Sequence, residues 1–115
     1  MNFKDKVVIV TGGTRGIGLE VAKSFYEKEA NVIIFGSKKE SVDKAVEELS
    51  KDNILVEGYY PNLNNYQEVV ETIDKIYNKY KRIDVLINNA GISANKKIED
   101  TTSEEFMHIM DININ

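Results

Sequence analysis

Short runs of apolar residues along this chain alternate with longer stretches in which apolar residues recur every three or four positions. Three continuous runs lie at residues 7–10, 32–35 and 85–87, and a weaker one lies at 54–59. Each is followed within two residues by glycine, proline or asparagine. A short apolar run closed in this way is typical of a strand that is buried on both faces of a sheet. We therefore predict four strands.

Apolar residues at helical spacing follow each of the first three predicted strands. They are Val21, Ala22 and Phe25, then Val42, Ala45, Val46 and Leu49, and then Val69, Val70, Ile73, Ile76, Tyr77 and Tyr80. This spacing places the apolar side chains on one side of a helix. A last helix is predicted to begin at Thr102, where Glu105 completes a capping box, and to run to the end of the chain.

The strict alternation of strand and helix predicts an α/β fold, a doubly wound parallel sheet with helices on both faces. Right-handed crossovers would place the strands in the order 3-2-1-4. The apolar strand at 85–87 would then form an edge without a neighbour, which is an aggregation liability. Together with the uncapped carboxyl end at 111–115, this edge predicts an incomplete sheet and a chain that is part of a longer one.

The composition is that of one soluble globular domain, with 42% hydrophobic and 30% charged residues among 115. The net charge of −4 argues against a nucleic-acid partner. Cysteine is absent and no metal-ligand spacing occurs, so neither a thiolate nucleophile nor a metal site is expected. Because no secretory signal and no membrane-spanning run is found, we expect a cytoplasmic protein without a membrane partner.

The glycine cluster T-G-G-T-R-G-I-G at residues 11–18 follows a predicted strand and opens a predicted helix. In that setting Gly12 would permit a tight turn, and Gly16 would let the backbone approach a pyrophosphate. Gly18 would allow the helix to pack closely on the strand. The phosphates would meet the unpaired N–H groups at the helix amino terminus. The simpler alternative is a tight turn that binds nothing.

This cluster resembles the cofactor motif of short-chain dehydrogenase/reductases, and N-N-A-G at residues 88–91 resembles the second hallmark of that family. The resemblance covers the whole chain and implies a Rossmann-type fold, of which residues 1–115 are the dinucleotide-binding half. The family's serine and its Tyr-x-x-x-Lys would lie beyond residue 115. It implies cofactor contacts from Gly12, Thr14, Arg15, Gly16, Ile17, Gly18, Asn62, Leu63, Asn89, Ala90 and Gly91, with Asn88 beside them.

The end of the second predicted strand bears on which dinucleotide is bound. A carboxylate there would bond the ribose 2′-hydroxyl of NAD(H) and repel a 2′-phosphate, but the first carboxylate is Glu40. Arg15 and Lys38 could neutralise a phosphate, and Ser37 could donate a hydrogen bond to it. NADP(H) is therefore predicted over NAD(H). The alternative is that Lys38 and Lys39 belong to a solvated turn, which we favour for Lys39.

The break after the third predicted strand departs from the family pattern, which has Asp followed by Val or Leu around the adenine ring. This chain has Asn62 and Leu63. An amide can still bond the adenine amino group through its carbonyl oxygen, so we expect the adenine site to survive with altered strength.

The resemblance also implies a proton relay through Asn113, within the last predicted helix. The alternative is a helix-end residue held between isoleucines. Tyr77 and Lys81 have the Tyr-x-x-x-Lys spacing, but they precede N-N-A-G instead of following it, so we interpret them as core and surface. His108 is interpreted as a helix-face residue.

Phe35, Gly36 and residues 88–93 and 103–113 resemble bacterial hydroxysteroid dehydrogenases that act on bile acids, in steroid and lipid metabolism. This implies an oxidoreductase that interconverts a secondary alcohol and a ketone by hydride transfer. A 3-oxoacyl-carrier-protein reductase shares nearly every motif. A non-catalytic dinucleotide-binding module is the third alternative, and Asn113 favours an enzyme over it. We expect this polypeptide to be inert alone, and the full-length enzyme to be a homo-oligomer joined partly by the helix near Thr102.

Overall fold

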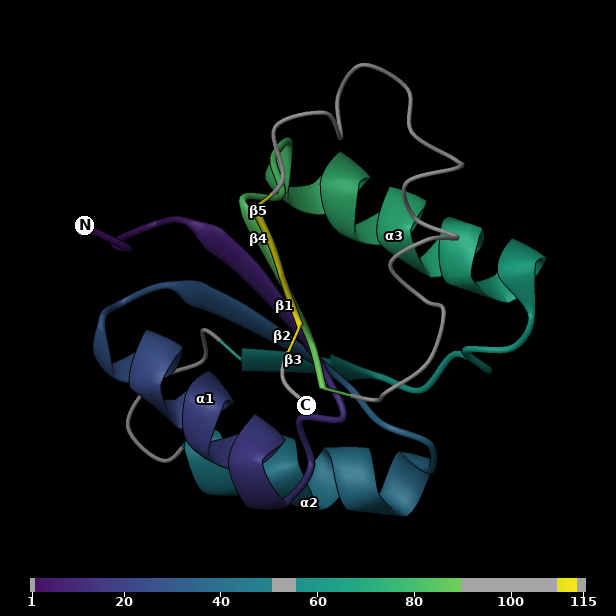
Figure 1. Cartoon of the computed structure of the whole chain (residues 1–115), viewed down its shortest axis with the longest axis horizontal. Coiled ribbons are helices and arrows are strands. Elements are labelled where there is room, and N and C mark those ends of the chain that lie inside the picture. Colours follow the sequence, from purple (N-terminus) through teal and green to yellow (C-terminus); the bar gives the residue numbers. More distant parts are fainter. Residues whose placement is uncertain (1, 51–55, 90–109, 114–115) are drawn as a thin grey trace.

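The computed structural model describes residues 2–50, 56–89 and 110–113, which form a parallel sheet with helices on both faces (Figure 1). The elements are β1 (Val7–Thr11), α1 (Gly16–Glu27), β2 (Asn31–Phe35), α2 (Lys39–Leu49), β3 (Val56–Tyr59), α3 (Tyr66–Tyr80), β4 (Val85–Asn88) and β5 (Met110–Asn113). The strands lie in the order β3-β2-β1-β4-β5. The α/β class and the order 3-2-1-4 are therefore confirmed.

The strand register brings the carboxyl ends of the strands to one edge of the sheet. Thr11, the last residue of β1, is paired with Phe35 of β2 and with Asn88 of β4. Phe35 is in turn paired with Tyr59, the last residue of β3. The loops that leave these strands carry most of the predicted site residues, so the sheet collects them at this carboxyl edge.

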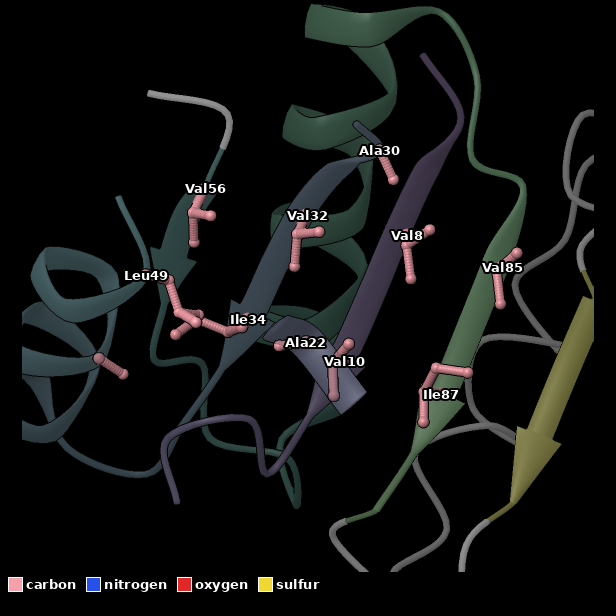
Figure 2. Packing of buried hydrophobic residues seen from close by; sticks show 11 residues of the cluster. Val8, Val10, Ala22, Ala30, Val32, Ile34, Leu49, Val56, Val85 and Ile87 are labelled. Atoms are coloured by element: carbon pink, nitrogen blue, oxygen red, sulfur yellow. The ribbon is translucent and has the colours of Figure 1, made fainter. Parts of the chain in front are cut away.

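The core has two halves, one on each face of the sheet. Val7 and Ile9 of β1 pack with α3, whereas Val8 and Val10 pack on the opposite face with α1 and α2. Figure 2 shows Val8, Val10, Val32 and Ile34 on that second face, with Ala22 of α1 among them. Because β1 and β2 are buried on both faces, their sequences are continuously apolar instead of alternating.

Strand β5 contradicts the prediction of a helix that runs to the end of the chain. Residues 110–113 pair in parallel with β4, with Val85 opposite Met110 and Asn88 opposite Asn113. Apolar Met110 and Ile112 alternate with Asp111 and Asn113, a period of two that suits a strand. The pairing supplies hydrogen-bond partners to the backbone of β4, so the expectation that β4 is an edge without a neighbour is also wrong. Residues 90–109, which include Thr102, Glu105 and His108, lie outside the described residues.

Asp84 joins the amino ends of β1 and β4. The Val7 N–H donates to Asp84 Oδ2 at 2.8 Å, and the Asp84 N–H donates to Val7 O at 2.9 Å. Arg82 donates to both carboxylate oxygens, from Nε at 2.8 Å and from Nη2 at 2.9 Å. Partial burial acts to raise the pKa of Asp84, but the Arg82 and Val7 hydrogen bonds outweigh it and hold the pKa below its ordinary value.

Asp84→Asn is expected to lower the free energy of unfolding by about 1 kcal/mol at pH 7, since a charge-assisted pair is lost from a partly exposed site. The carboxylate has a lower pKa in the folded state, so it stabilises the fold above its unfolded pKa of about 4. This contribution disappears as the pH falls through the folded pKa. Denaturant titrations at pH 7, 4 and 2.5 should show the gap between the two proteins closing mainly below pH 4.

The control for this prediction is Asp43→Asn, which removes a carboxylate from the exposed Lys39–Asp43 pair on α2. No measurable change is expected from it, because exposed ion pairs contribute little. A gap between Asp84→Asn and the parent that stays constant from pH 7 to pH 2.5 would contradict the linkage.

Candidate functional site

A cavity of about 640 Å³ opens at the carboxyl edge of the sheet, over the loops that follow β1, β2 and β3. Its volume falls within the range of about 300–1,000 Å³ that is usual for small-molecule sites. The lining residues are Gly12, Thr14, Arg15, Phe35, Gly36, Ser37, Tyr60, Pro61, Asn62, Leu63, Asn64 and Glu68. Ligands of open α/β sheets bind outside the carboxyl ends of the strands, so the cavity lies where a ligand is expected.

The cavity brings together predicted residues from three separate loops. Gly12, Thr14, Arg15, Ser37, Asn62 and Leu63 all line it. Gly16, Ile17, Gly18, Lys38 and Asn89 do not, and Ala90 and Gly91 lie outside the described residues. Sequence reasoning missed Tyr60 and Glu68. Glu68 lies three residues after the N-cap Asn65, the spacing of a capping box, but its carboxylate accepts from the Asn62 N–H and not from Asn65, so the spacing did not signal its place in the cavity.

The glycine loop after β1 has the backbone that its sequence predicts. Gly12 and Gly16 have φ angles of 65° and 59°, a left-handed conformation that other residues adopt only at a cost. A Cβ on Gly16 would meet nothing within 4 Å, whereas one on Gly18 would lie 2.0 Å from Gly12 O. Gly18 therefore allows the start of α1 to pack closely against the backbone of the glycine loop at Gly12.

Helix α1 begins at Gly16, and its N-cap residue Arg15 makes no side-chain hydrogen bond to the first turn. The first N–H groups of a helix need a partner from outside the helix. The open space at Gly16 leaves room for an anion to approach the backbone there, and the helix dipole favours negative charge at this end. The residues present therefore fit a diphosphate.

A buried to part-buried hydrogen-bond network joins the glycine loop to the end of β4. The Asn89 N–H donates to Thr11 Oγ1 at 3.0 Å, and Thr11 Oγ1 lies 3.2 Å from Asn88 Oδ1. The Asn89 side chain donates from Nδ2 to Gly12 O at 3.3 Å. The second hallmark motif thus holds the glycine loop in position, and the amide of Asn89 is engaged with the loop backbone.

The charged groups around the cavity favour a phosphate at one end. Among the described lining residues, Arg15 carries the one positive charge and Glu68 the one negative charge. Lys38 is the N-cap of α2 and is exposed, while Lys39 pairs with Asp43 at 2.7 Å. Lys39 therefore belongs to the solvated surface, as predicted.

Two tyrosines near β3 are held by a carboxylate outside the cavity. Glu57 accepts hydrogen bonds from Tyr59 and Tyr80 and pairs with Lys79. Burial and the Glu57 hydrogen bond raise the pKa of Tyr59 to about 12, and the same causes raise the pKa of Tyr80 further. A proton-transferring tyrosine needs a pKa nearer neutrality, so neither hydroxyl is suited to acid–base chemistry.

Tyr77 and Lys81, which have the Tyr-x-x-x-Lys spacing in and after α3, do not form a catalytic site. Tyr77 packs, partly buried, against the core cluster beneath α3, and the exposed Lys81 is the C-cap of that helix with a φ of 62°. This end of α3 lies at the amino edge of the sheet, away from the glycine loop. Asn113 lies in β5 beside Asn88 and not in a helix, so the expected setting is wrong, and its relay role stays a prediction.

Among residues 2–50, 56–89 and 110–113, which the structure describes, no cluster of histidine, aspartate and glutamate could hold a metal ion. Nor does any helix among them have the length and apolar character needed to cross a bilayer.

A family model described as short chain dehydrogenase matches residues 6–115. The chain belongs to the short-chain dehydrogenase family. Members of this family use a nicotinamide dinucleotide, so the cofactor class is NAD(P)(H). The short-chain dehydrogenase motifs in this chain are the glycine loop and the start of N-N-A-G, which the Thr11–Asn89 network ties together.

Relatives of this short-chain dehydrogenase carry several substrate names. A 3alpha-hydroxysteroid dehydrogenase of Mediterraneibacter gnavus is 41% identical over 99% of this chain and 46% of its own length. A 3-oxoacyl-[acyl-carrier-protein] reductase of Chlamydia muridarum is 36% identical over 96% of this chain and 45% of its own. The crystal structure of 2-keto-3-deoxy-D-gluconate dehydrogenase from Streptococcus agalactiae matches with a TM-score of 0.87 and 26% identity, covering 99% of this chain and 52% of that one.

The chain spans less than half the length of these two curated relatives. The matched part is the half whose fold and dinucleotide motifs are described above.

Proposed function

We propose that this short-chain dehydrogenase binds NADP(H) in preference to NAD(H). The diphosphate would be held by the glycine loop at the start of α1, and the 2′-phosphate by Arg15 and Ser37. The observation that carries this proposal is that both side chains line the cavity beside the glycine loop. Glu40, the first carboxylate after β2, does not line it. An anionic phosphate therefore meets a cation and a hydroxyl at this end, and no carboxylate from the β2 loop.

We further propose that the whole protein interconverts a secondary alcohol and a ketone on a small hydroxysteroid of the bile-acid type. The bound nicotinamide would supply the hydride chemistry, and the described residues would bind and orient the dinucleotide. The 41% identity to a hydroxysteroid dehydrogenase supports this substrate class. A second candidate, reduction of 3-oxoacyl thioesters, is favoured by the 36% identity to an acyl-carrier-protein reductase.

Assay of the whole gene product with bile acids and with acetoacetyl thioesters, each with NADP(H) and NAD(H), tests both proposals. We expect kcat/KM for a hydroxysteroid with NADP(H) to exceed the other combinations by about tenfold, because specificity is a difference in transition-state binding. Faster reduction of acetoacetyl thioesters would favour the second candidate. Tight NADPH binding with turnover of neither substrate would favour a non-catalytic module.

A further inference from the structure

We propose that Glu68 recognises the 6-amino group of the adenine ring and so makes this site selective for adenine nucleotides. The proposal rests on the dinucleotide site proposed above. The residue type expected to do this, an aspartate directly after β3, is absent, because the chain has Asn62 there. Glu68, in the first turn of α3, lines the same cavity and provides a carboxylate there.

The contacts of Asn62 explain why another acceptor is needed. Asn62 Oδ1 accepts the Asn64 N–H at 3.0 Å, so one of its two lone pairs is engaged in a local turn. The Asn62 N–H donates to Glu68 Oε1 at 3.0 Å. An amide oxygen engaged in a turn is a weaker acceptor for a ligand than a carboxylate, since hydrogen bonds to charged groups are about twice as strong as neutral ones.

Glu68 is exposed and makes two hydrogen bonds, one through its backbone N–H and one through its carboxylate. Its N–H donates to the side chain of the N-cap residue Asn65 at 3.1 Å, which fixes the first turn of α3. Its Oε1 accepts from the Asn62 N–H, which fixes the carboxylate against the β3–α3 loop. Among the described residues, none donates a hydrogen bond to the other oxygen, Oε2. A preorganised acceptor of this kind loses little entropy when a ligand binds.

The wall beside this acceptor suits a flat heterocycle. Tyr60, Pro61 and Leu63 line the cavity next to Asn62 and Glu68, and the Tyr60 side chain is 49% exposed. Aromatic and apolar surfaces stack on purine faces without distinguishing one base from another. The edge of the base therefore has to be read by a polar group. A carboxylate oxygen accepts from the amino group of adenine and repels the carbonyl oxygen that hypoxanthine carries at the same position.

The test compares NADPH with its deamino analogue, the reduced nicotinamide hypoxanthine dinucleotide phosphate. Binding to the whole gene product, the parent chain of this test, is measured by fluorescence titration. We expect the parent chain to prefer NADPH by about tenfold, the effect of one charge-assisted hydrogen bond. In Glu68→Gln the amide carbonyl can still accept the Asn62 N–H, while the amide nitrogen faces the base. The preference should then fall to about one or reverse toward hypoxanthine.

The matched control is Glu71→Gln, one turn further along α3, where an exposed carboxylate bonds Gln67 and does not line the cavity. It should keep the preference of the parent chain. Equal binding of both nucleotides by the parent chain overturns the role of Glu68 even if Glu68→Gln fails to fold. So does an unchanged preference in folded Glu68→Gln, and in both cases the dinucleotide site stands. Failure of the parent chain to bind either nucleotide overturns the proposed function and this inference together.

Discussion

Gly18→Ala is expected to lower the free energy of unfolding by about 3 kcal/mol and to abolish nucleotide binding. The new Cβ would lie 2.0 Å from Gly12 O and 2.7 Å from Asn89 Nδ2. Gly12 O is a backbone atom and Asn89 is bonded to it, so neither can move without displacing the glycine loop from β4. Denaturant unfolding measures the loss of stability, and NADPH titration at low temperature, where the variant remains folded, measures the loss of binding.

The control for this prediction is Gly16→Ala in the same loop. A Cβ at Gly16 meets nothing within 4 Å, but the φ of 59° is unfavourable for alanine by about 1 kcal/mol. We therefore expect a smaller loss of stability from Gly16→Ala than from Gly18→Ala. Equal losses for the two variants would mean that backbone strain, and not the contact between Gly18 and Gly12, governs this loop.

Ser37→Asp is expected to weaken NADPH binding by about a hundredfold and to strengthen NADH binding. Ser37 lines the cavity just after β2, where an acidic residue would accept from a ribose 2′-hydroxyl and repel a 2′-phosphate. A hundredfold change corresponds to about 2.7 kcal/mol, a reasonable value for two anions brought close together beside a partly buried cavity. Parallel titrations of the variant with NADPH and NADH give both numbers.

Asn78→Asp adds the same charge to an exposed position on α3, outside the residues that line the cavity. It should leave both affinities unchanged. If Ser37→Asp likewise leaves the affinity for NADPH unchanged, Ser37 does not lie beside the 2′-phosphate, and the predicted cofactor preference loses its main support.

The first two strands could be predicted because their burial is complete. Val8, Val10, Val32 and Ile34 are inaccessible to solvent, and a strand covered on both faces has no polar positions that would obscure its pattern. The conformation of the glycine loop could also be predicted from the sequence. The left-handed φ angles of Gly12 and Gly16 are conformations that the residue type itself signals.

The carboxyl end could not be predicted from local pattern. The sequence pattern predicts one helix from Thr102 to the end of the chain, but residues 110–113 form β5 because the backbone of β4 offers them hydrogen-bond partners. A segment of four residues with a period of two carries little information by itself. Whether it becomes a strand depends on a neighbour that is distant in the sequence.

By itself, the sequence of this protein determined the order of the first four strands, the glycine loop and the family. The glycine loop and the family motifs are local in sequence, and the strand order follows from the alternation of strands and helices with right-handed crossovers. Only the tertiary structure decided which polar groups share the cavity. Glu68 lies six residues beyond Asn62, yet it bonds the Asn62 backbone and lines the same space. Asn89 is predicted beside the cofactor, and the structure shows in addition that its side-chain amide holds the glycine loop. Such roles depend on how a helix and a loop are placed relative to each other in space, and the spacing of residues along the chain does not specify that placement.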